Sequence, residues 1–397
     1  MKDLLAIIKE KSATYKEEVI KIRRHLHQNP ELSFQEFNTS KFVCDKLDEY
    51  GIEFEKGIVK TGVVGLIKGN NPSSRTIALR ADLDALPILE ENNISYKSVN
   101  EGVMHACGHD VHTSSLLGVA KILNEVRDQF NGTVKLIFQP GEEKLPGGAS
   151  LMIAKGVLEN PIPVSIIGQH VYPQLDAGKV GFRSGMYMAS CDELYVTIKG
   201  KGGHAALPHQ NIDPILISSH IIIALQQLIS RIIPPTIPAV LSFGKISGNG
   251  ATNIIPDRVE LEGTFRIMNE EWRAVAHQKM IKMAESIAES MGGECIFRIE
   301  KGYPFLVNDE KVTGQAKTAA IEFLGSENVI DLDLRMTAED FAYYSQIKPA
   351  CFYRLGIKNN QNKTTPGLHT STFNIDESAI ETSIGLMSWI AIKELAR

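Results

Sequence analysis

Eight consecutive residues, His105 to His112, carry one thiol, three imidazoles and one carboxylate. Side chains of these types either bind transition metals or take part in nucleophilic catalysis. Cys107 could act as a nucleophile with His105 or His109 as its base, or the same groups could hold metal. The other candidate ligands in the chain decide between a nucleophilic cysteine and a metal site.

Further candidate ligands follow the predicted strands of the chain. Strands are expected at 76–81, 133–138, 164–168 and 351–355, where short apolar runs are rich in β-branched residues. The acidic and imidazole side chains that come after them are Asp82, Asp84, Glu142, Glu143, His170 and His369. Sites in open α/β sheets form outside the carboxyl ends of the strands. A nucleophilic Cys107 leaves Glu143, His170 and His369 without a role, so the sequence favours a metal site.

The elements that position these residues alternate between helix and strand. Apolar residues from Val111 to Val126 recur at helical spacing, so the cluster enters a helix that Asp110 or Thr113 would cap. Other helices are expected at 3–28, 34–50, 148–157, 309–324 and 377–395. This alternation predicts an α/β catalytic domain with a mixed, largely parallel sheet covered on both faces.

Residues 186–299 have a different pattern. Strands at 193–199, 239–246 and 258–266 combine with a helix that begins at Asp213-Pro214 and another at 271–291. The resulting β-α-β-β-α-β order predicts an inserted α+β domain of the ferredoxin-like type. We therefore divide the chain into a catalytic domain, residues 1–185 and 300–397, and an inserted lid or dimerisation domain, residues 186–299.

Composition narrows the class of protein. A chain of 397 residues with 43% hydrophobic and 22% charged residues is expected to form two soluble domains. The formal net charge of −5 and the absence of a basic run argue against a nucleic-acid partner. The apolar run 215–229 is interrupted by polar residues, which predicts a buried helix and not a membrane span. Five scattered cysteines and a charged N-terminal helix, without a signal peptide, predict a cytoplasmic protein.

A series of short motifs spans nearly the whole chain. They are Arg23-Arg24-His25-Leu26-His27, Pro30-Glu31-Leu32-Ser33, Leu79 to Pro87, Met104 to Asp110, Phe138 to Glu143, Gly202 to Ala206, Pro208-His209, Gly263 to Arg266 and Ala338 to Phe341. With these motifs in this order, the chain resembles the N-acyl-amino-acid amidohydrolases. That family includes hippurate hydrolases, N-acetyldiaminopimelate deacetylases and auxin-conjugate hydrolases, and it belongs to the wider aminoacylase and carboxypeptidase G metallopeptidase clan.

The resemblance implies a site for two divalent metal ions per subunit, which could be zinc, manganese, cobalt or nickel. In that site Cys107 lies between the ions, His109 and His170 hold one ion, and Glu143 and His369 hold the other. Asp82 stands where many members of the clan have a metal-binding histidine, so it is not counted as a ligand.

The resemblance also assigns roles around the metals. Glu142 is expected to be the general base, and Asp84 to orient a ligand imidazole. From the insert, His204 would stabilise the tetrahedral oxyanion, in the same subunit or from a partner, and Asn253 and Arg266 would hold the substrate's α-carboxylate. A homodimer through the insert is expected, and a tetramer is the alternative.

The expected activity is hydrolysis of the amide bond of an N-acyl amino acid, acetyl or benzoyl in type, to a carboxylate and a free amino acid. A dipeptidase or carboxypeptidase would use the same site, and an N-acetyldiaminopimelate deacetylase is a further specialisation. A non-catalytic, metal-stabilised protein that binds acylated amino acids is the alternative from another class. Glu142 argues against it, because a purely structural site needs ligands but no base.

Overall fold

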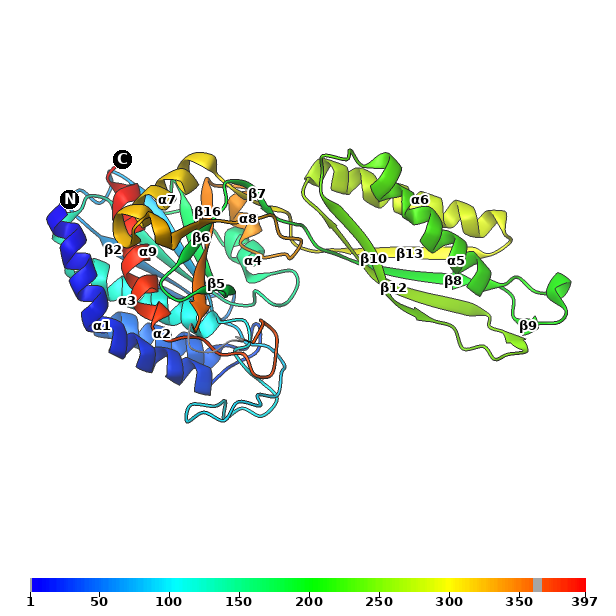
Figure 1. Cartoon of the computed structure of the whole chain (residues 1–397), viewed down its shortest axis with the longest axis horizontal. Coiled ribbons are helices and arrows are strands. Elements are labelled where there is room, and N and C mark those ends of the chain that lie inside the picture. The colour runs from blue at the N-terminus through cyan, green and yellow to red at the C-terminus, as the bar shows by residue number, and fades with distance from the viewer. Residues whose placement is uncertain (1, 360–365) are drawn as a thin grey trace. The chain divides into compact units, whose positions relative to one another are not determined.

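The computed structural model describes residues 2–359 and 366–397. The chain forms two compact units (Figure 1). The first comprises Met1–Gly185, Val307–Asp333 and Asp340–Arg397, and the second comprises Met186–Leu306 and Leu334–Glu339. Residues 300–306 and 334–339, which the predicted boundaries place in the catalytic domain, thus belong to the second unit.

The first unit is built on a mixed eight-stranded sheet of order β1-β2-β4-β3-β5-β16-β6-β15. Its strands are β1 (Glu53–Ile58), β2 (Gly62–Lys68), β3 (Thr76–Asp82), β4 (Thr133–Gln139), β5 (Ile166–Asp176), β6 (Val180–Phe182), β15 (Val329–Asp331) and β16 (Ala350–Lys358). The central strands β4, β3, β5 and β16 run parallel, and antiparallel pairs flank them. The predicted mixed, largely parallel sheet is confirmed.

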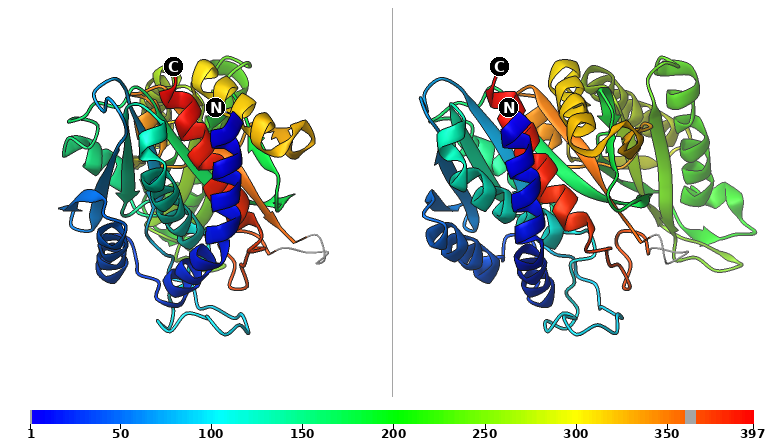
Figure 2. Two further views of the ribbon diagram at one scale, coloured as in Figure 1. Left: turned by 90° about the vertical axis from the view of Figure 1, so that its left-hand side faces the viewer. Right: turned by 60° about the vertical axis from the view of Figure 1, so that its left-hand side comes forward.

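Helices pack against this sheet. They are α1 (Lys2–Gln28), α2 (Phe37–Glu49), α3 (His109–Glu125), α4 (Gly148–Ala154), α7 (Glu310–Leu324), α8 (Ala342–Ser345) and α9 (Ala379–Leu395), with short turns η1 (Arg127–Gln129) and η4 (Ser326–Asn328). α1 and α9 lie side by side and both contact α3, which also contacts β3 and is buried over most of its length (Figure 2). Their apolar faces form one continuous core with the sheet.

The start of α3 differs from the sequence prediction. Neither Asp110 nor Thr113 caps the helix, because α3 begins at His109 and Gly108 occupies the N-cap position with a φ of 85°. A Cβ atom on Gly108 would lie 2.5 Å from a methyl group of Val171, so both the backbone angle and the packing require glycine. The cluster therefore leaves its turn directly into the helix, with His109 as the first helical residue.

The second unit has a four-stranded antiparallel sheet of order β10-β12-β8-β13. Its main elements are, in chain order, β8 (Asp192–Lys199), α5 (Pro214–Leu225), β10 (Ala239–Ser247), β12 (Arg258–Ile267), α6 (Glu270–Ser290) and β13 (Glu294–Lys301). The β-α-β-β-α-β order and this strand arrangement are those of a ferredoxin-like fold. Smaller elements are β9 (Gly203–His204), η2 (Pro208–Gln210), η3 (Leu228–Ile232) and β11 (Ile254–Ile255). Two of the places where the chain passes between the units lie in β7 (Gly185–Met188) and β14 (Leu306–Asn308).

Helix α5 begins as predicted, because the side chain of Asp213 accepts hydrogen bonds from the amides of Ile215 and Leu216. The prediction that this apolar segment is buried is wrong. Pro214–Ile232 is long and apolar enough to cross a membrane, yet only 28% of its apolar 18-residue window is buried. One face packs on the core of the second unit, and the other leaves Ile223 73% exposed.

Candidate metal centre

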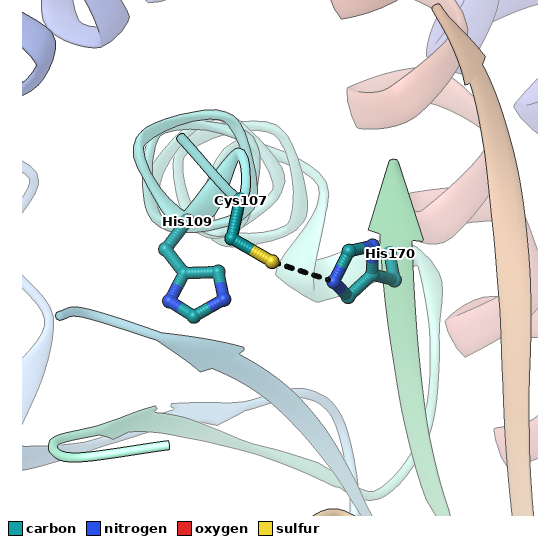
Figure 3. A group of neighbouring side chains, drawn as sticks. All are labelled: Cys107, His109 and His170. Atoms are coloured by element: carbon teal, nitrogen blue, oxygen red, sulfur yellow. Dashed lines mark hydrogen bonds between the residues drawn. The ribbon is translucent and has the colours of Figure 1, made fainter. Parts of the chain in front are cut away.

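Three side chains, from the turn before α3, the first residue of α3 and β5, come together around one sulfur atom. The Sγ atom of Cys107 lies 3.4 Å from Nε2 of His170, and the donor atoms of Cys107, His109 and His170 all lie within 4.8 Å of one another (Figure 3). A second set, Cys107, Glu143 and His369, meets the same distance limit. Cys107 belongs to both sets, so two groups of three donors share one thiol.

The sheet explains why these residues meet. Asp82 at the end of β3 pairs in register with Gln139 at the end of β4, so the loops after the two strands leave from the same level. His170 lies within β5 and not beyond its end as predicted, because β5 continues to Asp176 alongside β16. The His369 loop is joined to the cluster by its backbone, where the amide of His369 donates to the carbonyl of Ala106 at 2.8 Å.

The hydrogen bonds of His109 fix which ring nitrogen carries its proton. Nδ1 lies 2.9 Å from the backbone carbonyl oxygen of Asp84, which can only accept, so Nδ1 must be the donor. Among the described residues, no hydrogen-bond partner reaches the buried Nε2 atom. In the neutral ring that nitrogen keeps its lone pair, as a metal-ligating imidazole requires.

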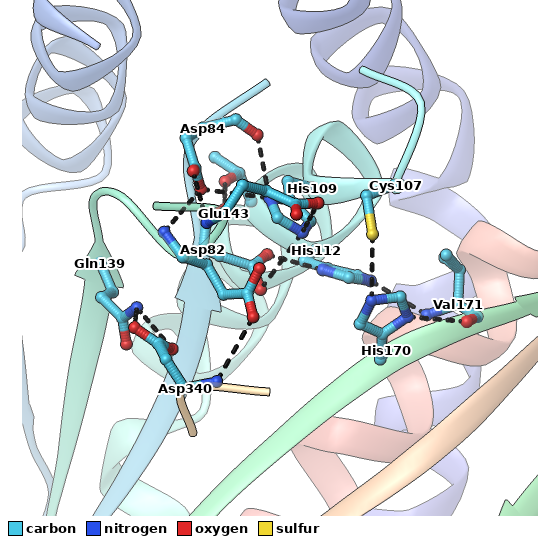
Figure 4. Close-up of polar contacts among 12 residues, drawn as sticks. Asp82, Asp84, Cys107, His109, His112, Gln139, Glu143, His170, Val171 and Asp340 are labelled. Atoms are coloured by element: carbon cyan, nitrogen blue, oxygen red, sulfur yellow. Dashed lines mark hydrogen bonds and ion pairs between the residues drawn. The ribbon is translucent and has the colours of Figure 1, made fainter. Parts of the chain in front are cut away.

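His170 is fixed in the same way. Its Nδ1 atom donates to the carbonyl oxygen of Val171 at 2.8 Å, which leaves the lone pair of Nε2 directed towards Cys107 (Figure 4). The amide of Val171 in turn donates to Nε2 of His112 at 3.0 Å. His112 must then carry its proton on Nδ1, which donates to Asp82 at 2.6 Å. Both nitrogens of His112 are therefore used, and this residue supports His170 instead of offering a ligand atom.

The side chain of Asp84 holds the loop that carries Glu142 and Glu143 by binding the backbone amides of that loop. Its two carboxylate oxygens accept the amides of Glu142 at 3.0 Å and Glu143 at 2.9 Å (Figure 4). Ser33 adds a hydroxyl hydrogen bond of 2.6 Å, and His109 approaches the same carboxylate at 3.2 Å. Asp84 is buried, but the hydrogen bonds that it accepts outweigh the effect of burial and hold the pKa of its carboxyl below the usual value. Asp84 thus contacts one candidate ligand ring and orders the loop that carries another candidate ligand, Glu143.

Glu142 is buried near the donor atoms. A carboxylate oxygen of Glu142, a ring nitrogen of His109 and a carboxylate oxygen of Glu143 form a third group of donor atoms within 4.8 Å of one another. The Glu142 carboxylate also accepts the amide of Asp340 at 3.3 Å. Asp340 is itself held by Arg80, whose guanidinium donates at 2.7 Å to Asp340 and at 2.6 Å to Asp82. Sequence reasoning did not assign roles to Arg80, Asp340 or His112. Their place within or beside the quoted motifs was the only signal, because Arg80 meets Asp340, and His112 meets Asp82, only when the chain folds.

The site favours positive charge. Burial lowers the pKa of the His109 imidazole, but the negative charge of Asp82, then the interaction with Cys107 and the hydrogen bond with Asp84, outweigh burial and hold that pKa well above its usual value. Hydrogen bonds to Cys107 and Glu143 raise the pKa of His369 to about 10. Burial, and then the charge of Glu143, raises the pKa of the Cys107 thiol. The negative groups that retain these protons would equally attract a metal cation, which takes the place of the proton on a ligating imidazole. One thiol, carboxylates and imidazoles are a donor set that fits divalent transition metals.

The remaining predicted residues lie in the second unit. His204 pairs with Ile254 between β9 and β11, and the amide of Ala205 donates to the carbonyl of Asn253 at 3.0 Å, so His204 and Asn253 lie close to each other. Arg266 lies on β12, where its Nε donates to the hydroxyl of Thr264 at 3.0 Å. Their roles towards a substrate remain predictions.

A family model described as peptidase family M20/M25/M40 matches residues 78–392. The chain is 41% identical over 382 residues to the N-acetyl-L-cysteine deacetylase of Bacillus subtilis strain 168, and the matched region covers 95% of this chain and 89% of that protein. It is 38% identical over 395 residues to thermostable carboxypeptidase 2 of Saccharolobus solfataricus, covering 98% and 99%. A solved Bacillus subtilis structure, described as a dinuclear metal-binding peptidase of the M20 family, matches with a TM-score of 0.83 and 36% identity, covering 97% of this chain and 99% of that one.

Proposed function

The chain belongs to peptidase family M20/M25/M40, a family of metal-dependent hydrolases, and we propose that it hydrolyses the amide bond of N-acyl amino acids to a carboxylate and a free amino acid. One observation carries the proposal most directly. The buried Cys107 thiol belongs to two groups of three donor atoms, one with His109 and His170 and one with Glu143 and His369, in the part of the chain that matches the family model. The similarity to an N-acetyl-L-cysteine deacetylase supports an N-acyl amino acid as substrate.

We propose two divalent ions as the cofactor. Cys107, His109 and His170 would hold one ion, and Cys107, Glu143 and His369 the other, as the two overlapping groups of donor atoms suggest. The similar Bacillus subtilis structure described as dinuclear supports this number. Thiolate and imidazole suit zinc, and manganese, cobalt and nickel are the other candidates. When bound, such ions lower the pKa of water and polarise the amide carbonyl.

The chain's own residues would move the proton and hold the substrate. Glu142, which is not needed as a ligand, would accept the proton of the attacking water on its carboxylate and deliver it to the leaving amine nitrogen. His204 would donate a hydrogen bond to the oxyanion that forms at the carbonyl. Asn253 and Arg266 would hold the free carboxylate of the amino acid, for which a planar guanidinium is suited.

A carboxypeptidase or dipeptidase is the second candidate, since a dipeptide resembles an N-acyl amino acid at the bond that is broken. The specific observation in its favour is the 38% identity to a thermostable carboxypeptidase over nearly the whole chain. An N-acetyldiaminopimelate deacetylase would be a narrower version of the first proposal. The preferred acyl group decides among these activities.

We also propose a cytoplasmic homodimer that forms through the second unit, with a tetramer as the alternative. The support for the interface is the exposed apolar face of α5, where Ile215, Leu216 and Ile223 are 42%, 50% and 73% exposed. Burial of such a face is the common reason for association. All five cysteines carry free thiols, which suits a reducing compartment.

The test of the proposed activity is a substrate panel with a matched variant. The purified protein is loaded with zinc, manganese, cobalt or nickel and assayed on N-acetyl amino acids, N-benzoyl amino acids and dipeptides. Glu142→Gln keeps the shape of the side chain but cannot act as a base, so we expect turnover to fall by 100-fold or more while metal content stays at the wild-type level. A metal-loaded wild-type protein that hydrolyses none of these compounds would favour the non-catalytic binding protein.

A further inference from the structure

Three consecutive backbone amides of the loop that carries Glu142 and Glu143 donate to buried carboxylates. Two of them, those of Glu142 and Glu143, donate to Asp84. The third, the amide of Gly141, donates at 2.9 Å to Oε1 of Glu36, which lies 105 residues earlier in the chain. Glu36 is fully buried and has no role in the proposed mechanism.

The other contacts of Glu36 hold its carboxylate in place. The same Oε1 atom also accepts the amide of Phe34 at 2.8 Å, and Oε2 accepts the hydroxyl of Thr61 at 2.7 Å. Glu36 occupies the N-cap position of α2, but its side chain does not cap that helix. The side chain instead spans from the segment before α2 to the loop after β4.

The two segments also touch directly. Gly141 has a φ of 61°, and a Cβ atom there would lie 2.4 Å from the ring of Phe34. Ser33, next to Phe34, donates its hydroxyl to Asp84 at 2.6 Å. Residues 33–36 therefore support both carboxylates that bind the loop, and Glu36 sets the backbone immediately before Glu142.

We propose that Glu36 is a positioning residue, which fixes the backbone of residues 141–143 and through it the carboxylates of Glu142 and Glu143. The inference rests on the proposed metal site. Residues that orient ligands in this indirect way typically change metal affinity or activity by 10- to 100-fold when they are replaced. A small displacement of a catalytic group is sufficient to lower turnover to that extent.

Three substitutions at Glu36 separate the effect of side-chain geometry from the effect of side-chain charge. In Glu36→Gln the amide oxygen can accept the same two backbone amides, and the Thr61 hydroxyl can rotate to accept from the new amide group. In Glu36→Asp the carboxyl group and its ability to ionise remain, but the side chain is one methylene too short to reach Gly141. Glu36→Ala removes the acceptor altogether. The matched control is Glu394→Ala, which removes another buried carboxylate of the same unit, one that pairs with Arg75 and Arg397.

The experiment uses the full chain and two readouts. The first is the affinity for Co²⁺, measured by competition with a chelator and by the absorption of the cobalt–thiolate bond, which needs no substrate. The second is kcat and KM on the best substrate of the panel. We expect Glu36→Ala and Glu36→Asp to lower Co²⁺ affinity and kcat by tenfold or more with KM within threefold of wild type. Glu36→Gln and Glu394→Ala should stay within threefold on all three quantities.

Three results would overturn the proposal. The first is wild-type Co²⁺ affinity and kcat in Glu36→Asp, which remains informative if the alanine variant does not fold. The second is an equal loss in Glu36→Gln, which would assign the effect to charge. The third is an equal loss in Glu394→Ala, which would assign it to general destabilisation. If the wild type binds Co²⁺ but hydrolyses nothing, the proposed activity fails, and the affinity measurement still decides the role of Glu36.

Discussion

Glu36→Gln is expected to stabilise the metal-free protein more at pH 8 than at pH 5. Burial, and then the negative charge of Asp84, raises the pKa of the Glu36 carboxyl from 4.5 to about 7. Its hydrogen bonds from the Thr61 hydroxyl and from the backbone amides of Glu36 and Phe34 act in the opposite direction but do not cancel these two effects. The folded state therefore holds this proton at a pH where the unfolded chain has released it.

The magnitude follows from the size of the shift. As pH rises from the unfolded pKa to the folded pKa, the wild type loses stability, and the total loss is about 3 kcal/mol for a shift of this size. Most of that loss, about 2.5 kcal/mol, develops between pH 5 and pH 8. Glutamine does not ionise, so the variant avoids the loss. Relative to wild type, its melting temperature should rise by roughly 5 °C on going from pH 5 to pH 8.

The assay is thermal unfolding of wild type and variant at both pH values in the presence of a chelator, so that other titrating groups cancel in the difference. Glu394→Gln is the control. It leaves Arg75 and Arg397 without their shared anion, and it should lose stability at both pH values. An advantage of Glu36→Gln that is the same at pH 5 and pH 8 would refute the argument that burial and Asp84 keep Glu36 protonated.

Three further outcomes are expected. Arg266→Ala should raise KM roughly tenfold or more for substrates with a free carboxylate, as loss of a charged hydrogen bond predicts. An equal rise in KM for the corresponding amides would show that Arg266 does not bind the substrate carboxylate. Gly141→Ala should destabilise the chain by about 1–3 kcal/mol because the new methyl meets Phe34, whereas Gly102→Ala, also at positive φ but with nothing within 4 Å, should cost less in thermal unfolding. Ile223→Glu should shift the protein towards monomer in sedimentation measurements, and an unchanged dimer would place the interface elsewhere.

Local patterns predicted most of the fold. Strand-like runs, Asp213-Pro214 and the β-α-β-β-α-β order depend on neighbours in the sequence, and the structure agrees with them. The edge strand β1 was not predicted because only one of its two faces has partial burial and its sequence is largely charged. The short strands β6 and β15 have three residues each, too few for a periodic pattern.

The errors concern features that distant partners decide. His170 was expected after a strand, but pairing with β16 extends β5 through it. Asp110 was expected to cap α3, but it pairs with Arg23 and His27 of α1 instead. Helix α5 is apolar nearly all round, so its sequence alone could not show which face packs on the sheet.

The candidate site was predictable only in part for the same reason. Its chemical types were visible in the sequence, and the positions after β3 and β4 suggested that the acidic residues meet. The proton positions on His109 and His170 were not predictable, because they depend on the carbonyl oxygens of Asp84 and Val171. Glu36 gave no local signal, since its partner Gly141 lies in another part of the chain.

The most direct test of the account is the metal content of the wild type and of Cys107→Ala, measured by mass spectrometry after gel filtration in metal-free buffer. A thiol shared by two groups of donors predicts two divalent ions per chain in the wild type and fewer than one in the variant. A Cys107→Ala protein that is folded and still holds two ions would contradict the shared sulfur on which the proposed site is built.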